Sequence, residues 1–342
     1  MSDKVPVRIG LVGCGLHGNN LAQVVVRSDL LRLVGCADPD EDAARRAAAL
    51  ARDVGVYPSV DALLQSCAVD AIVIAAPHDQ LGPASLAAIR AGKHVLLEKP
   101  MAMDEDEARQ VERAAEAAEV NCMVGYSFRF SMGRYVHDLL TAGAVGEIQT
   151  ISGSIGTGPM NRGWTAKPEC GGGPLLYVGC HLVDFLFWFT GAEAASVSAE
   201  VRRRGDTGTD ETSAIQIAMA NGVLAQFMVT QAAPAFFYDL HVYGRAGAIA
   251  LRGRNFLQFD VEVISTVLPA FQEPTVVRPT IRRDNISMML VPELEEFARS
   301  ITERRPPAIT ASDGRRVCAV LDAIVESGRS GQPQNLQTVA AR

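Results

Sequence analysis

The chain has 342 residues, which is long enough for two domains, since compact domains cluster at about 100 to 150 residues. Its 48% hydrophobic and 21% charged residues match an ordinary globular protein and exclude a disordered or fibrous chain. The net charge of −7, without a dense basic block, argues against nucleic-acid binding.

The amino-terminal stretch and the cysteines indicate the expected location. The apolar run near the start is interrupted by Arg8 and is too short to span a bilayer, so we expect a cytoplasmic protein with no membrane partner. The seven cysteines are scattered among Ala, Val and Gly, as small core residues are, which argues against a disulfide framework. Cys170 and the pair Cys180-His181 lack a close Cys-x-x-Cys partner, so we predict no metal.

The first part of the chain alternates strands and helices. Short β-branched runs occupy 7–13, 31–38 and 70–77, with Ala-rich helical segments between them at 19–28 and 41–52. The rhythm continues with helix 83–91, strand 93–100, helix 104–118 and strand 121–126. Continuous apolar strands separated by helices predict a parallel sheet that is covered on both faces. We therefore expect a doubly wound α/β domain over residues 1–123.

After a predicted helix at 132–142 the pattern changes to strands. The stretch "SAIQIAMANGVLAQFMVTQ" alternates across Asn221-Gly222, the strongest short hairpin signal. Further strand candidates lie at 147–156, 195–204, 237–243, 248–252 and 255–260. The second domain, 124–342, is therefore expected to be strand-rich and antiparallel. Helical patterns return at 292–304 and at 313–327, the latter expected to end at Gly328.

Gly13, Gly15 and Gly18 stand in G-x-G-x-x-G spacing between the first strand and the first helix. The spacing alone is a weak signal, but its place in a strand-to-helix turn makes it specific for a dinucleotide. Gly13 permits the tight turn, Gly15 lets the pyrophosphate approach the backbone, and Gly18 lets the helix pack on the strand. The helix N-terminus supplies N–H groups for the phosphates.

Asp38 is the acidic residue that this motif requires about 20 residues further on, at the end of the second strand. A carboxylate there accepts hydrogen bonds from the adenine ribose and repels a 2′-phosphate, so NAD is the predicted cofactor. Two alternatives stay open. Asp38 could be a turn or N-cap residue, and NADP is possible because Arg45 and Arg46 are near in sequence.

Glu98-Lys99-Pro100 ends the predicted strand 93–100. Because the residue before proline is held extended, Lys99 is expected at the carboxyl end of a sheet strand, where open α/β folds bind ligands. A lysine there can hydrogen-bond a substrate hydroxyl and stabilise the alkoxide as hydride leaves. On these residues alone, a surface lysine is an equal alternative.

Over nearly its whole length the chain resembles the Gfo/Idh/MocA oxidoreductases, named for glucose-fructose oxidoreductase and inositol dehydrogenase. The resemblance rests on "GLVGCGLHG", "AGKHVLLEKPMA", "GYSFRF" followed by "GAVGEIQTISG", "GGGPLLYVGCHLVD" and "EEFARSITERRPP", in this order. It implies a Rossmann domain, then an α/β domain with a large open, mainly antiparallel sheet that often serves in oligomer contacts. It also implies a bound NAD(P), a sugar, polyol or cyclitol substrate, and a homodimer or homotetramer.

The resemblance assigns roles in "GGGPLLYVGCHLVD" and beside it. His181 matches the residue that moves the substrate hydroxyl proton, Lys99 the lysine that orients this hydroxyl, and Asp184 a substrate-binding carboxylate. On a helix, Tyr177, His181 and Asp184 would share one face. Tyr177 stands where many sugar dehydrogenases of the family have Asp. A phenol orients the imidazole less than a carboxylate does, but it can donate to substrate or relay a proton, so we count Tyr177 as catalytic.

Other positions complete the predicted site. The remaining cofactor-binding residues are Leu16, His17, Ala76, Pro77, His78 and Glu98. Leu81 and Ser127 depart from the family, which usually has His and Asn there. The Gly- and Pro-rich loop 156–173 offers Asn161, Arg162, Trp164 and Lys167. We predict that Trp164 stacks on a sugar ring and that Arg162 or Lys167 binds hydroxyls or a carboxylate, the alternative being ordinary solvent-exposed side chains. Arg129 is a further substrate candidate, or else part of an ion pair at the domain junction.

The leading hypothesis is an NAD-dependent dehydrogenase or reductase of a sugar, polyol or cyclitol. Hydride passes to the nicotinamide while His181, helped by Lys99, takes the hydroxyl proton. One alternative is a hydrolase or epimerase that uses tightly held NAD for transient oxidation, and another is a non-catalytic NAD(P)- or sugar-binding sensor. Lys99, His181 and Asp184 together argue against the sensor, since binding alone would not need all three.

Overall fold

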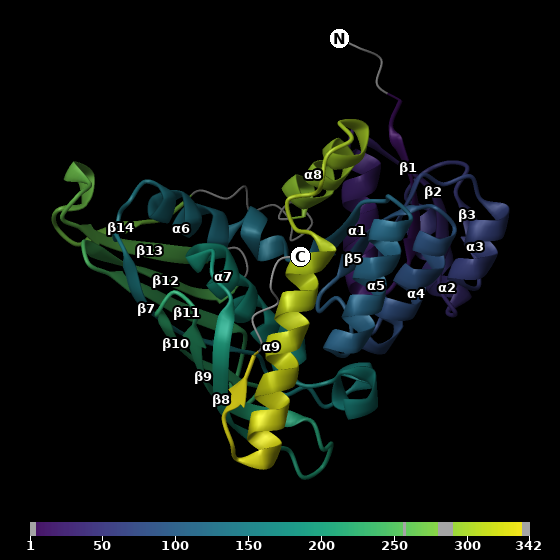
Figure 1. Ribbon diagram of the computed structural model, residues 1–342. Coiled ribbons are helices and arrows are strands. Elements are labelled where there is room, and N and C mark those ends of the chain that lie inside the picture. Colours follow the sequence, from purple (N-terminus) through teal and green to yellow (C-terminus); the bar gives the residue numbers. More distant parts are fainter. Residues whose placement is uncertain (1–4, 256–257, 280–289, 337–342) are drawn as a thin grey trace. The chain divides into compact units, whose positions relative to one another are not determined.

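The structure, a computed structural model, describes residues 5–255, 258–279 and 290–336 (Figure 1). The chain forms two compact units, residues 1–130 with 283–318 and residues 131–282 with 319–342. The predicted functional division, at residue 123, stays a prediction.

The first unit contains a six-stranded parallel sheet in the order β3-β2-β1-β4-β5-β6. Its strands are β1 (Val7–Val12), β2 (Leu31–Ala37), β3 (Gly55–Tyr57), β4 (Ala71–Ile74), β5 (His94–Glu98) and β6 (Cys122–Gly125). Its helices before residue 130 are α1 (Leu16–Arg27), α2 (Glu41–Ala48), α3 (Val60–Ser66), α4 (His78–Arg90), α5 (Glu105–Ala117) and the 3-10 turn Ser127–Phe130. Every residue of β4 and β6 is buried, so both faces of the sheet are covered. The doubly wound parallel domain is confirmed.

Two details of this unit differ from the expectation. Strand β3 and helix α3 were not predicted, because three and seven residues are too short to show a clear period. Helix α4 begins at His78, and Pro83 lies inside it. The predicted start at residue 83 was wrong, because the helix already begins at His78.

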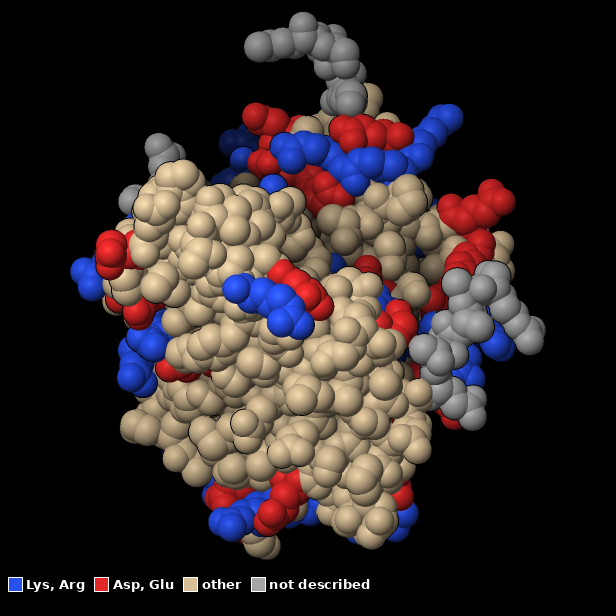
Figure 2. Space-filling view, turned by 60° about the vertical axis from the view of Figure 1, so that its left-hand side comes forward, with Lys and Arg blue, Asp and Glu red and all other residues tan. Residues whose placement is uncertain are grey.

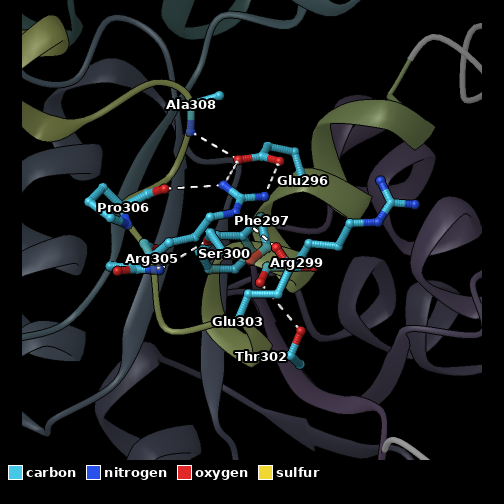
Figure 3. Close-up of polar contacts among 10 residues, drawn as sticks. Glu296, Phe297, Arg299, Ser300, Thr302, Glu303, Arg305, Pro306 and Ala308 are labelled. Carbon is cyan, nitrogen blue, oxygen red and sulfur yellow. Dashed lines mark hydrogen bonds and ion pairs between the residues drawn. The ribbon is translucent and has the colours of Figure 1, made fainter. Parts of the chain in front are cut away.

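Residues 290–318 return to the first unit. Helix α8 (Val291–Thr302) is followed by a turn in which the Arg305 guanidinium binds both oxygens of Glu296, at 2.6 and 2.7 Å (Figure 3). The Ala308 N–H donates to the same carboxylate at 3.1 Å. The Asn121 side chain donates to the Arg305 carbonyl at 2.9 Å, next to β6. The segment "EEFARSITERRPP" thus ties α8 to the parallel sheet.

The second unit contains a nine-stranded sheet in the order β14-β13-β12-β11-β7-β10-β9-β8-β15. Its strands are β7 (Ile148–Gly156), β8 (Ala194–Arg203), β9 (Asp210–Met219), β10 (Leu224–Thr230), β11 (Phe237–Gly244), β12 (Gly247–Asn255), β13 (Gln258–Ser265), β14 (Thr275–Val277) and β15 (Gln334–Asn335). All neighbours are antiparallel except β7 and β10. This confirms the mainly antiparallel sheet, and β9 and β10 form the predicted hairpin, with Gly222 at φ +88°.

This sheet has one covered and one open face. Along β10, Ala225 and Phe227 are buried, whereas Leu224 and Met228 are 61% and 44% exposed. Helices α6 (Met132–Thr141) and α7 (Cys180–Thr190) belong to this unit. A Cβ at Gly179, just before α7, would lie 3.0 Å from the Val229 side chain, so the helix starts in close contact with the covered face.

The stretch 168–190 is long and apolar enough to cross a membrane by length and composition. However, 83% of its apolar window is buried inside the structure. Such burial is typical of a core helix.

Two predicted ends in the second unit were wrong. Helix α9 (Ala311–Ser330) continues past Gly328 and stops before Gly331, at φ +67°. A Cβ at Gly328 would lie 2.6 Å from Val201, so this glycine allows a close approach to β8 and does not cap the helix. The predicted strand 255–260 is divided between β12 and β13, and its residues 256 and 257 lie outside the described residues.

Candidate active site

The three glycines of the first turn meet different surroundings. Gly13 has φ +85°, and a Cβ there would lie 2.3 Å from the Ala75 carbonyl oxygen. A Cβ at Gly18 would lie 1.9 Å from the Gly13 carbonyl oxygen. At Gly15 a Cβ would meet nothing within 4 Å. The fold itself therefore requires Gly13 and Gly18, whereas Gly15 leaves open space at the backbone.

This open space lies at the N-terminus of α1, for which Gly15 is the N-cap residue. Within the described part of the chain, no side chain caps this helix and no acidic residue lies in its first turn. The first N–H groups and the positive end of the helix dipole are thus available to an anion. Leu16, the next residue, is 86% exposed. The turn fits the pyrophosphate of a dinucleotide.

Asp38 binds the same turn. Its Oδ2 accepts a hydrogen bond from the Cys14 N–H at 2.7 Å, and its Oδ1 accepts one from the Asp40 N–H at 2.8 Å. The second bond is a local turn, one of the two alternatives weighed for Asp38. The other alternative, the N-cap, does not apply, because Asp40 caps α2. Arg46, one of the two arginines for which NADP was kept as an alternative, lies 3.9 Å from Asp40.

His17 and Glu98 meet where the glycine turn approaches β5. The His17 Nε2 and the Glu98 Oε1 lie 2.6 Å apart. Burial disfavours the imidazolium, but the negative charge of Glu98 outweighs it and raises the pKa of His17. Burial likewise opposes ionisation of Glu98, yet the charges of His17 and Lys99 outweigh it and lower the pKa of Glu98. The two residues form an ion pair beside Lys99.

A second carboxyl near this pair was not predicted. Glu293, in the first turn of α8, is fully buried, and among the described residues neither of its oxygens has a hydrogen-bond partner. Burial and the negative charge of Glu98 hold the pKa of Glu293 well above its usual range. The sequence does carry a signal, because Glu293 stands four residues before Phe297 on the apolar face of the helix.

The other predicted residues of the first unit lie around the ends of β4 and β6. A Cβ at Gly13 would lie 3.0 Å from the Ala76 nitrogen. Pro77 is the N-cap of α4, and His78, its first residue, is buried. Arg129 is buried and lies 3.9 Å from Asp313, so its ion pair lies within the first unit and not at a domain junction.

In the second unit, the predicted catalytic helix does not begin as a regular α-helix. Leu175–Gly179 forms a π-helical turn that contains Tyr177, and α7 starts at Cys180, one residue before His181. Such wide turns recur at functional sites. Asp184 is fully buried, and His181 is 4% exposed.

An aromatic pair stands beside this turn. Trp164, in the 3-10 turn Gly163–Ala166, approaches the Tyr177 ring edge to face, with centroids 6.0 Å apart and an interplanar angle of 61°. Arg162 and Lys167 flank the same 3-10 turn. The structure thus brings the 156–173 loop to Tyr177.

The triple glycine is explained by its neighbours. A Cβ at Gly172 would lie 2.4 Å from the Thr165 carbonyl oxygen, and one at Gly173, at φ +112°, would lie 2.0 Å from the Asp210 Oδ1. The other Asp210 oxygen accepts a hydrogen bond from the Leu175 N–H at 2.9 Å. Burial raises the pKa of Asp210 to about 6. Asp210 was not predicted, and it lies far from this helix in sequence.

The described residues hold no cluster of candidate metal ligands. Within residues 5–255, 258–279 and 290–336, no group of three or more His, Cys, Asp or Glu side chains could hold a metal ion. All seven cysteines carry free thiols.

The predicted site residues fall into two groups. The glycine turn, Asp38, His17, Glu98 and Lys99 belong to the first unit, and Trp164, Tyr177, His181 and Asp184 to the second. A glycine turn fitted to a pyrophosphate at the head of a parallel sheet in this strand order defines a dinucleotide-binding α/β protein.

Comparisons with known proteins identify the class further. Residues 7–126 match the NAD-binding Rossmann fold of an oxidoreductase family, and residues 134–250 match the GFO/IDH/MocA C-terminal domain. A trans-1,2-dihydrobenzene-1,2-diol dehydrogenase of Xenopus laevis is 31% identical over 302 residues, 86% of this chain and 89% of the relative. An inositol 2-dehydrogenase of Rhizobium meliloti is 26% identical over 94% of this chain and 96% of its own.

The structure of a levoglucosan dehydrogenase in complex with NADH and L-sorbose superposes with a TM-score of 0.87, covering 98% of this chain and 100% of that one, at 19% identity. At this level of identity, the likeness shows that the two chains share a fold. The chain belongs to the Gfo/Idh/MocA oxidoreductase family. It is an NAD(P)-dependent oxidoreductase with a Rossmann domain that binds NAD.

Proposed function

We propose that the protein transfers hydride between NAD and a secondary alcohol of a sugar, polyol or cyclitol. The observation that carries the proposal is the open space at Gly15, at the uncapped N-terminus of α1, in a chain that also holds Lys99 and His181 in the family order. When bound, NAD supplies the hydride acceptor.

The chain's own residues manage the hydroxyl. Lys99 donates a hydrogen bond to the substrate oxygen and stabilises its negative charge as the C–H bond breaks. His181 takes the hydroxyl proton, since an imidazole titrates near neutral pH. The products are a ketone or lactone, NADH and a protonated His181. Tyr177 replaces the carboxylate of related dehydrogenases and serves as a donor to the substrate.

We further propose that cofactor binding and substrate binding belong to different parts of the chain, which meet at residue 123. Residues 1–123 hold the cofactor, and Asp38 favours NAD over NADP because its carboxylate repels a 2′-phosphate. Residues 124–342 bind the substrate, with Arg162, Asp184 and Arg129 as candidate contacts. The cytoplasmic location also stays a proposal.

The aromatic pair supports a ring-shaped substrate. Trp164 and Tyr177 present two apolar surfaces beside the π-helical turn, and aromatic faces bind the C–H side of a ring. The related dehydrogenases act, by their names, on inositol, levoglucosan and a dihydrobenzene diol, which are all cyclic alcohols. We therefore propose a cyclic secondary alcohol with one apolar face.

The test is the absorbance of NADH while the protein and NAD, then NADP, meet myo-inositol, levoglucosan, trans-1,2-dihydrobenzene-1,2-diol and D-glucose. We expect net reduction that is lost in Lys99→Ala and in His181→Ala. Lys93→Ala and His241→Ala are matched controls that keep the activity. Activity that survives in His181→Ala would contradict the assigned role.

We propose that copies of the chain associate through the open face of the nine-stranded sheet. Leu224, Met228, Tyr243 and Ile264 are 40% to 61% exposed. Figure 2, which turns the side carrying this sheet in Figure 1 forward, shows a broad surface with few charged side chains. Sedimentation velocity tests this, and Met228→Glu is expected to shift a dimer or tetramer toward the monomer. A Met228→Glu protein that sediments like the wild type would contradict the proposal.

A further inference from the structure

A buried glutamine stands at one end of the loop that carries Trp164. Gln231 directly follows β10 and is 1% exposed. Its Oε1 accepts a hydrogen bond from the Met160 N–H at 2.8 Å, and its Nε2 donates to the Asp210 carbonyl at 2.6 Å. An amide side chain supplies an acceptor oxygen and a donor nitrogen together.

The hydrogen bonds continue from Gln231 to the other end of the loop. Asp210 accepts from Gln231 with its carbonyl and from the Leu175 N–H with its carboxylate, at 2.6 and 2.9 Å. The two ends of the 156–173 loop are therefore fastened to one pair of buried residues. Leu175 begins the π-helical turn that contains Tyr177, so the same pair also fixes the start of this turn.

Further contacts hold the loop at this place. The Thr157 N–H donates to the Thr230 carbonyl at 3.0 Å, directly before Gln231. Gly172 has no room for a side chain, because the Thr165 carbonyl occupies the position where its Cβ would lie. Trp164 then meets Tyr177 edge to face. All these residues belong to the second unit.

We propose that Gln231 is a positioning residue for substrate recognition: by bridging Met160 and Asp210 it sets the 156–173 loop so that Trp164 stands beside Tyr177. The inference rests on the proposed function, in which this aromatic pair binds the apolar face of a cyclic alcohol. A side chain misplaced by about 1 Å can cost on the order of a hundred-fold in rate, so an anchor outside the substrate's reach has a kinetic effect.

Trp164 itself reports the position of the loop. The chain has two tryptophans, so a Trp188→Phe background leaves Trp164 as the single indole. In this background, acrylamide quenching is compared for Gln231→Met, which keeps the length of the side chain but loses both hydrogen bonds. Gln272→Met is the matched control, at an exposed glutamine away from β10. We expect stronger quenching of Trp164 in Gln231→Met and no such change in Gln272→Met.

The kinetic experiment uses whichever of the compounds tested under the proposed function reduces NAD fastest. We expect Gln231→Met to raise its KM about ten-fold or more, with the Kd for NAD unchanged in calorimetry. If Gln231→Met does not fold, Gln231→Asn keeps both amide groups on a side chain one methylene shorter and is measured in its place.

Two results would overturn the proposal. One is equal quenching of Trp164 in the Gln231 and Gln272 variants. The other is stronger quenching in Gln231→Met with an unchanged KM. If no alcohol reduces NAD, the proposed function fails separately, and the quenching comparison alone decides whether Gln231 holds Trp164 in place.

Discussion

Asp210→Asn is expected to stabilise the protein above pH 6. Burial raises the pKa of Asp210 from 3.8 to about 6. Between these pH values the unfolded chain loses the proton while the native protein keeps it, so native stability falls as pH rises through this window. Above pH 6 the penalty is complete. Asparagine carries no charge and keeps an oxygen to accept the hydrogen bond from the Leu175 N–H.

The size of the effect follows from the shift. A difference of about two pKa units, at 1.36 kcal/mol each, corresponds to about 3 kcal/mol. Because the Asp210 residue is only 8% exposed, little of this is screened by solvent. The gain of Asp210→Asn over the wild type should approach this value at pH 8 and shrink steadily toward pH 4.

The assay is urea unfolding followed by circular dichroism at pH 5, 6, 7 and 8, for the wild type and Asp210→Asn. Asp206→Asn is the control, since Asp206 is exposed on the preceding turn. An Asn variant that is less stable than the wild type at pH 8 would refute the reasoning. So would a gap between the two proteins that is equal at pH 5 and pH 8.

Three further predictions concern the first unit. Gly18→Ala should lower the melting temperature, because its Cβ would lie 1.9 Å from a carbonyl oxygen. Gly15→Ala should leave the melting temperature unchanged and weaken NAD binding in calorimetry, and equal melting temperatures of the two variants would contradict this difference. His17→Gln should be less stable than the wild type at pH 6, and the difference should shrink toward pH 9. The ion pair with Glu98 raises the pKa of His17, so its contribution to stability is lost as pH rises and the imidazolium loses its proton; a difference in melting temperature that stays constant from pH 6 to pH 9 would oppose this. Glu293→Gln should gain stability relative to the wild type in urea unfolding as pH rises above 4.5, since burial raises the pKa of this carboxyl. A variant less stable than the wild type at pH 8 would contradict the raised pKa.

Local patterns predicted the fold well where they are long. The strand and helix alternation predicted the parallel sheet, and Asn221-Gly222 predicted the hairpin, because both signals depend on neighbouring residues. Gly328 shows the limit. A glycine that ends a helix and one that lets a helix approach a strand look alike in sequence, and only the position of Val201 distinguishes them.

Candidates for the chemistry of the site came from contiguous motifs. The glycine turn and Glu98-Lys99-Pro100 are such motifs. Asp210 begins β9 and Gln231 directly follows β10, both far in sequence from the loop that they hold. Their partners are brought to them by the sheet register and not by sequence spacing. To predict the buried carboxyl of Glu293, one must know which face of α8 is buried within the unit that contains the parallel sheet. The sequence offers candidates for the reacting residues, whereas the residues that hold the loop in place are found only in the structure.

The most direct test of hydride transfer is a single turnover with NAD stoichiometric to the protein, followed by stopped-flow absorbance of NADH. This measurement detects a transient oxidation even when no net product forms, so it covers both the dehydrogenase and the hidden-redox enzyme. We predict NADH formation on mixing with a cyclic alcohol of the panel, at a rate that falls in His181→Ala. NAD that binds in calorimetry but gives no NADH with any of these alcohols would contradict the account and favour a non-catalytic sensor.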